Sequence, residues 1–166
     1  MTNSFEMGKT QTFFGMRVVC DVSIEMDDGT VLRADVFLPQ EDGHYPAIIT
    51  YGPYGKGVAF QEGYKSSWDA MVAAYPEITK GSTCTFQNWE LVDPEKWVPD
   101  GYVCIRVDGR GSGRSPGKID LLSPRELQDF YECIEWAAIQ PWCNGKVGIN
   151  GISYYAINAA GPSAPQ

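Results

Sequence analysis

The chain has 166 residues, of which 43% are hydrophobic and 20% are charged, a balance typical of one packed domain. This composition excludes a disordered chain. Twenty-one acidic and 13 basic side chains give a net charge of −8, which repels phosphate backbones, so we expect no nucleic-acid partner. No apolar run reaches the roughly 18 residues that a membrane helix needs, so we expect no membrane partner. The N-terminus lacks the basic start and long apolar stretch of a secretory signal.

The cysteines point to a reducing environment. Their number is odd and no C-x-x-C pair occurs, which argues against a disulfide framework and a zinc ribbon. We therefore expect free buried thiols, a cytoplasmic location, and no metal or cofactor. His44 is the only histidine available for chemistry. The cysteines are Cys20, Cys84, Cys104, Cys133 and Cys143.

Two alternating segments near the N-terminus predict an antiparallel hairpin. In residues 17–26 every second residue is apolar, which predicts a strand with one buried and one solvent face. The sequence Asp27-Asp28-Gly29 is typical of a tight turn and has too few carboxylates for a calcium loop. Residues 32–38 then resume the alternation. The predicted buried face comprises Val18, Cys20, Val22, Ile24 and Met26, and the predicted solvent face Arg17, Asp21, Ser23 and Glu25.

The remaining pattern predicts an α/β fold in which parallel strands and helices follow the hairpin. Residues 47–51, 102–107 and 146–150 are short apolar runs, as expected for strands covered on both faces. Residues 123–138 predict a helix, with Ser123 as N-cap and Glu126 closing a capping box. This strand–helix–strand unit indicates a parallel crossover, and another helix is expected after Gly151. We interpret residues 55–99 as a crossover with an insertion and two short helices.

The strongest chemical signal is the sequence Gly151-Ile152-Ser153-Tyr154-Tyr155-Ala156, which nearly matches the nucleophile elbow G-x-S-x-G. A predicted strand precedes it and a predicted helix follows, as the elbow requires. The serine of an elbow sits on a strained turn, so small residues must flank it. Gly151 fits this requirement, but Tyr155 occupies the final glycine position. Spacing alone leaves two alternatives for Ser153, a nucleophile or an ordinary loop serine.

Two neighbouring glycine-rich patterns are not supported as sites. The sequence around Ser115 matches G-x-S-x-G, but Pro116 has no N–H to donate to an oxyanion, so Ser115 is rejected as a nucleophile. Residues 108–114 fail the glycine spacing of dinucleotide-binding and phosphate-binding loops. We interpret them as a turn after a strand, held by hydrogen bonds of Asp108 and Arg110.

The loop of residues 51–56 is a candidate for the oxyanion hole. In α/β-hydrolase topology the loop after the third strand supplies the second oxyanion donor. The hydroxyl of Tyr54 could be that donor. Without Ser153, an exposed turn tyrosine is the simpler interpretation.

Four segments together resemble the cocaine esterase / X-prolyl dipeptidyl peptidase family of α/β-hydrolases. They are DVSIEMDDGTVLRADVFLP, PAIITYGPYGK, GYVCIRVDGRGSGRSPG and IEWAAIQPWCNGKVGINGISYYA, within residues 17–158. The resemblance implies a serine hydrolase that acts on small-molecule ester or amide (peptide) substrates through an acyl-serine. It implies Ser153 as the nucleophile, with the Tyr54 hydroxyl and the Tyr154 backbone N–H as oxyanion donors. Ala156 stands where the family has glycine.

The triad partners of the resemblance do not align. The family's Asp and His follow the serine, whereas the 13 residues after Ser153 contain no Asp, Glu or His. His44 precedes a parallel strand, opposite the catalytic edge. We therefore expect an incomplete α/β-hydrolase sheet that ends just after the elbow. Residues 1–158 would be the N-terminal part of a catalytic domain and residues 159–166 a disordered tail.

Such a fragment is expected to be inactive by itself. Its last strand would be an exposed sheet edge, which predicts self-association. The alternative is a non-enzymatic α/β interaction module, or a half-protein that pairs with another chain.

Overall fold

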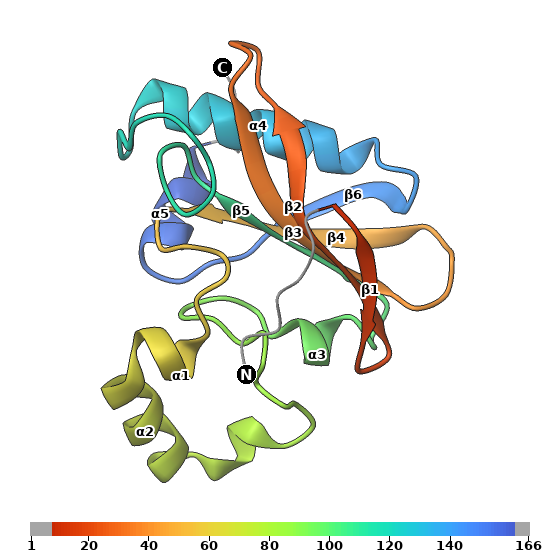
Figure 1. Ribbon diagram of the computed structural model, residues 1–166, viewed down its shortest axis with the longest axis vertical. Helices are drawn as coiled ribbons and strands as arrows, with labels where there is room; N and C mark the ends of the chain where they lie inside the picture. The colour runs from red at the N-terminus through yellow and green to blue at the C-terminus, as the bar shows by residue number, and fades with distance from the viewer. Residues whose placement is uncertain (1–7, 162–166) are drawn as a thin grey trace.

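The computed structural model describes residues 8–161, which form a mixed six-stranded sheet with helices on both faces (Figure 1). The strand order is β1-β2-β3-β5-β4-β6. The strands are β1 (Thr10–Phe13), β2 (Met16–Glu25), β3 (Val31–Pro39), β4 (Tyr45–Gly52), β5 (Val103–Asp108) and β6 (Cys143–Ile149). The helices are α1 (Phe60–Gly63), α2 (Lys65–Ala74), the 3₁₀ helix η1 (Pro76–Thr79), α3 (Pro94–Trp97), α4 (Pro124–Ala138) and α5 (Tyr154–Ala160).

The sheet confirms the predicted antiparallel hairpin followed by parallel strands. β2 and β3 pair antiparallel, β3 continues antiparallel to β5, and β4 runs parallel to both β5 and β6. The crossover through α4 joins β5 to β6, which lie on either side of β4. The carboxyl ends of β4, β5 and β6 therefore lie together at one end of the strands, which we call the carboxyl end of the sheet. In the described residues β6 is the edge strand next to β4.

A β-bulge in β2 inserts one extra residue opposite β3. Val19 lies opposite Val36, whereas Val22 lies opposite Ala34, so β2 advances by three residues while β3 advances by two. Asp21, inside the bulge, has a left-handed φ of 56°. Alternating sequence gives no sign of such an extra residue, because polar and apolar residues continue to alternate through it.

The bulge moves even-numbered side chains of β2 from one face of the sheet to the other. Val18 packs with Phe37 in the core beside α3, whereas Ile24 packs with Leu32 in the core against α4. The single buried face predicted for residues 17–26 is therefore wrong. Asp21, predicted to face solvent, is only 6% exposed.

The larger of the two cores lies between the sheet and α4. Phe130, Cys133 and Ala137 of α4 pack there against central strand residues such as Ile49 and Ile105. The segment of residues 55–99 lies on the other side of the sheet (Figure 1). It contains α1, α2, η1 and α3, which is more helix than the two short helices expected from its irregular pattern.

The C-terminal boundary differs from the expectation of a tail that begins at residue 159. Ala159 and Ala160 are the last two residues of α5, because alanine is a strong helix former and continues the helix that starts at Tyr154. Residues 162–166 of the expected tail lie outside the described residues.

Candidate active site

Ser153 occupies the turn between β6 and α5, at the carboxyl end of the sheet. Its backbone has φ 57° and ψ −122°, a combination that is rare for a residue with a side chain. The side chain is exposed and makes no capping hydrogen bond to α5. A strained, exposed serine between a strand and a helix is the geometry of a nucleophile elbow.

Close packing around Tyr155 explains the departure from the elbow pattern. A Cβ at Gly151 would lie 2.3 Å from the Cβ of Tyr155, and a Cβ at Gly52 would lie 2.4 Å from its ring. Both positions therefore require glycine. The large side chain in the final glycine position of the motif is accommodated because β4 presents Gly52 to the buried ring.

The structure brings the loop after β4 against the elbow. The ring of Tyr54 lies edge-to-face with those of Tyr154 and Tyr155, at centroid distances of 6.2 and 5.5 Å. Tyr54 is 40% exposed. Partial burial, and then the charge of Glu90, raise the pKa of its phenol, so it remains a proton donor at neutral pH.

Lys56 anchors the Tyr54 loop to the sheet. Its Nζ lies 2.6 Å from Asp21 Oδ1 and 3.0 Å from Asp35 Oδ1, with all three side chains buried. Its backbone N–H donates to Asp108 Oδ1 at 2.7 Å. Burial acts to lower the pKa of Lys56, but the charge of Asp35 and the hydrogen bond to Asp21 outweigh it and the pKa is raised.

Sequence reasoning missed this anchor. The sequence contained two signals, a lysine at the end of the tyrosine loop and an acidic residue within a largely apolar strand. Alternation placed Asp21 on the solvent face, however, and only the bulge turns it toward Lys56.

Ser115 is a structural residue, as its rejection as a nucleophile requires. It is 6% exposed, its hydroxyl donates to the Asp108 carbonyl at 2.6 Å, and it accepts the Arg33 N–H at 2.9 Å. Two hydrogen bonds to backbone groups occupy the oxygen that a nucleophile would need free.

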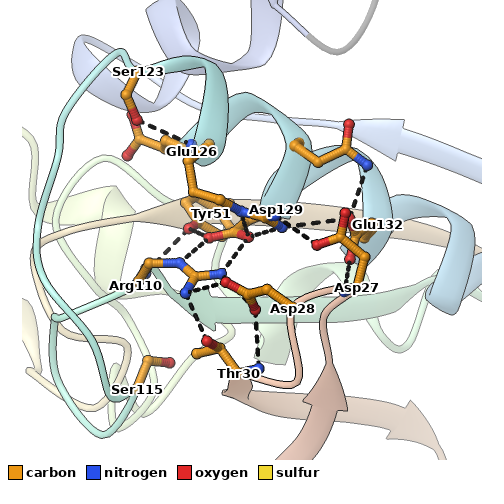
Figure 2. A network of polar contacts seen from close by, with 12 residues as sticks. Asp27, Asp28, Thr30, Tyr51, Arg110, Ser115, Ser123, Glu126, Asp129 and Glu132 are labelled. Carbon is orange, nitrogen blue, oxygen red and sulfur yellow. Dashed lines mark hydrogen bonds and ion pairs between the residues drawn. The ribbon is translucent and has the colours of Figure 1, made fainter.

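The glycine-rich turn after β5 is held by the polar network shown in Figure 2. Arg110 Nε lies 2.7 Å from Asp129 Oδ2 on α4, and Arg110 Nη1 lies 2.9 Å from Asp28 Oδ2 in the β2–β3 turn. Asp108 accepts the Arg114 N–H at 2.8 Å. The hydrogen bond from Arg110 is the main cause of the lowered pKa of Asp28. The interpretation of a turn held by Asp108 and Arg110 is confirmed.

The capping box predicted at the start of α4 forms only in part. The Ser123 hydroxyl accepts the Glu126 N–H at 3.1 Å, as an N-cap does (Figure 2). The Glu126 carboxylate does not return to the N-cap. It accepts the Leu122 N–H at 2.6 Å and the Tyr154 hydroxyl at 2.5 Å.

His44 lies away from the carboxyl end of the sheet. It directly precedes β4, whose carboxyl end carries the Tyr54 loop, and it lines an open groove of about 470 Å³ together with Arg17 and Trp142. It therefore occupies the end of the strand opposite the elbow, as the sequence predicted.

Among residues 8–161 no group of His, Cys, Asp and Glu side chains is arranged to hold a metal ion. Across the same residues, no helix has the length and apolar character needed to cross a bilayer.

Known proteins share the sequence and the fold. The X-Pro dipeptidyl-peptidase (S15) family matches residues 28–164. Cocaine esterase of Rhodococcus sp. (strain MB1 Bresler) is 29% identical over 140 residues, which are 84% of this chain and 20% of that protein. A Mycobacterium bovis protein whose name proposes a serine esterase is 42% identical over 140 residues, which are 82% of this chain and 20% of that protein.

A solved structure gives the same picture. A CocE/NonD family hydrolase from Staphylococcus aureus superposes with a TM-score of 0.77 at 35% identity, covering 94% of this chain and 28% of that one. The chain spans about a fifth of the length of the curated relatives it matches. Its sheet is of the α/β-hydrolase type, and the chain belongs to the X-Pro dipeptidyl-peptidase (S15) family of hydrolases.

Proposed function

We propose that the chain carries the nucleophile and the oxyanion hole of a serine hydrolase that cleaves ester or amide bonds of small molecules. Ser153 is the nucleophile, and the Tyr54 hydroxyl and the Tyr154 backbone N–H are the oxyanion donors. The observation that carries the proposal is the strained, exposed backbone of Ser153 beside the Tyr54 loop.

The chemistry follows from these positions. Ser153 Oγ attacks the carbonyl carbon while a general base takes its proton, and the carbonyl π electrons move onto the oxygen. The oxyanion accepts hydrogen bonds from Tyr54 and the Tyr154 N–H. The carbon–leaving-group bond then breaks as the leaving group takes a proton, and water hydrolyses the acyl-serine. Within the described residues His44 lies at the wrong end of β4 to act as the base.

A fluorophosphonate probe tests the assignment of Ser153. The longest natural chain that contains this segment is labelled, and the modified peptide is identified by mass spectrometry. We expect a single label on Ser153, which Ser153→Ala abolishes and which the control Ser66→Ala, at an exposed serine of α2, leaves unchanged. Labelling elsewhere, or full turnover by Ser153→Ala, contradicts the proposal.

The second candidate is a non-enzymatic module that pairs through its sheet. The edge position of β6 favours it, because an edge strand offers unpaired backbone groups to another chain. The same labelling separates the two functions, since a module that has lost its chemistry leaves Ser153 unmodified.

A cytoplasmic location forms part of the proposal. All five cysteines are free, and four of them are buried. Burial raises the pKa of Cys20 and of Cys104 to about 12, so both remain protonated and unreactive. Free thiols are typical of a reducing compartment.

A further inference from the structure

We propose that Glu126 is a positioning residue for the oxyanion hole, because its carboxylate holds the side chain of Tyr154 and so fixes the peptide N–H that follows Ser153. The inference rests on the proposed function of Ser153. The observation behind it is that the Glu126 carboxylate bonds to Leu122 and Tyr154 instead of returning to the N-cap Ser123.

Glu126 is a rigid point of attachment. It lies in the first turn of α4, a helix of 15 residues whose Phe130 and Ala137 are buried in the main core. Glu126 itself is 8% exposed. A buried carboxylate is stabilised by hydrogen bonds from donors, and here one oxygen, Oε2, receives both of them.

The element that Glu126 restrains has little stability of its own. Tyr154 is the first residue of α5, which has only seven residues and starts from the strained Ser153. Helices this short are marginal in water. The first turn of α5 is formed by the N–H groups of Ala156 and Ile157, both of which donate to the Ser153 carbonyl at 3.1 Å. The hydrogen bond between Glu126 and Tyr154 therefore restrains the turn that carries Ser153.

Backbone strain in both segments that Glu126 joins, at Leu122 and at Ser153, supports a positioning role. Leu122, whose N–H donates to Glu126, has a φ of 56° although it is a bulky side chain that is 54% exposed. Ser153, next to Tyr154, has a φ of 57°. Left-handed residues other than glycine cost of order 1–3 kcal/mol each and persist only where neighbouring structure holds them. Glu126 bonds directly to the segment of each.

The pKa of Tyr154 is consistent with this bond. Burial first, and then the hydrogen bond to Glu126, raise the pKa of the phenol, so the hydroxyl keeps the proton that it donates.

The first test uses the 166-residue chain and does not depend on turnover. Tyr154→Phe removes the hydroxyl and keeps the ring and the peptide N–H. We expect amide hydrogen exchange at Ala156 and Ile157 to become roughly tenfold faster, with exchange in β4 and β5 unchanged. The control Tyr131→Phe removes an exposed hydroxyl from α4 and should change neither. Unchanged exchange at Ala156 and Ile157 overturns the proposal.

The second test measures turnover in the longest natural chain that contains the segment. We expect Tyr154→Phe and Glu126→Leu each to lower kcat about tenfold at nearly constant KM. The double variant should be no worse than Glu126→Leu alone, because Glu126→Leu already removes the bond that Tyr154→Phe removes. Glu126→Gln keeps an accepting oxygen and should restore most of kcat.

Losses that multiply in the double variant, or a kcat of Tyr154→Phe within twofold of the parent, overturn the positioning role. If Glu126→Leu does not fold, Tyr154→Phe and Glu126→Gln decide the question. Failure of the proposed function is distinguishable, because Ser153→Ala would then retain turnover whatever the exchange experiment shows.

Discussion

At the scale of single residues, the loop after β4 places two neighbouring side chains in opposite environments. Tyr54 is 40% exposed and contacts the elbow, whereas Lys56, two residues later, is 7% exposed and points into the sheet. The buried lysine holds the backbone of the loop, and the exposed tyrosine is left to meet a substrate. An oxyanion donor is effective only when it is held in place before the reaction begins.

Tyr54→Phe tests the exposed member of this pair. Loss of one oxyanion donor should lower kcat by about a hundredfold or more while the fold is retained. Steady-state kinetics of the longest natural chain, with thermal unfolding as a check of folding, measure this. Tyr75→Phe, at a tyrosine that is 59% exposed on the helical insertion, is the matched control. An unchanged rate in Tyr54→Phe would reduce Tyr54 to a turn residue.

Lys56→Met tests the buried member. Removing one partner of a buried ion pair leaves uncompensated charges, so the free energy of unfolding should fall by about 3–5 kcal/mol. Lys65→Met breaks an exposed ion pair with Asp69 and should cost no more than about 0.5 kcal/mol. Urea denaturation of the two variants measures the difference. Equal costs would mean that the Lys56 cluster contributes no more than a surface pair.

At the scale of elements, polar contacts link α4 to three loops of the sheet: the β2–β3 turn, the turn after β5 and the elbow after β6. Asp129, which is fully buried on α4, accepts a charged hydrogen bond from Arg110 after β5 (Figure 2). It accepts another from Arg125 on its own helix. Arg110 continues to Asp28 in the β2–β3 turn. The hairpin turn, the glycine-rich turn and α4 are therefore held as one unit, and Glu126 on the same helix reaches the elbow.

Asp129→Asn should loosen this unit. The substitution removes a buried charge from between two arginines, and the free energy of unfolding should fall by about 3–5 kcal/mol. Amide exchange at Gly29 in the hairpin turn should rise more than exchange in β4. Asp42→Asn, at a carboxylate whose side chain is 95% exposed, should have little effect. A result in which both variants behave alike would contradict the role of the network.

The sequence predicted the elements whose signals are local. The β2–β3 hairpin, the Ser123 N-cap of α4 and the glycine of the elbow all depend on residues close in the chain, and the structure has each of them. The unpredicted features depend on distant partners. Lys56 meets a carboxylate 35 residues away, and Glu126 meets a hydroxyl 28 residues away. No spacing rule reveals such pairs before the sheet order is known.

The candidate site was predicted in its positions but not in its support. The sequence singled out Ser153, Tyr54 and Tyr154, and the structure places the Tyr54 loop beside the elbow. Their roles in catalysis remain a prediction. What holds them was not visible, since the bulge that turns Asp21 inward leaves the alternation of β2 intact.

At the scale of the whole molecule, the sheet has an open side. In the described residues β6 pairs only with β4, and Ile152, three residues after the end of β6, is 63% exposed. An unpaired strand edge, with an exposed apolar side chain just after the strand, favours association with another chain.

We therefore expect the 166-residue chain, expressed alone, to self-associate through β6. We also expect it to show no esterase turnover, because its one histidine, His44, lies at the end of β4 opposite Ser153. Size-exclusion chromatography and hydrolysis of p-nitrophenyl acetate measure these properties, with Ser153→Ala as the blank. Gly148→Lys adds a charge at an exposed edge position where a Cβ finds ordinary contact, and it should favour the monomer. A monodisperse monomer with Ser153-dependent turnover would contradict both expectations.

Stability should also fall at alkaline pH. Burial raises the pKa of Tyr51 and of Tyr155 above the ordinary value of about 10, so the folded state holds these protons more tightly than the unfolded state. Their contribution is complete below pH 10 and is lost as the pH rises through the folded-state values. Urea denaturation between pH 7 and 11.5 measures this. Tyr155→Phe should lose less stability over the alkaline range than the parent, and equal losses would exclude Tyr155 as a cause.

The bulge in β2 makes the number of residues in the strand matter as much as their identity. Val18 and Ile24 are six residues apart and would share one face of an uninterrupted strand, whereas the bulge directs them to different cores. Deleting Cys20, which is only half-buried, would remove the extra residue while Val19 stays opposite Val36 and Val22 stays opposite Ala34. A single lost codon at this point would therefore leave both hydrophobic cores in register, and its effect would fall on Asp21, which would lose its left-handed backbone beside Lys56.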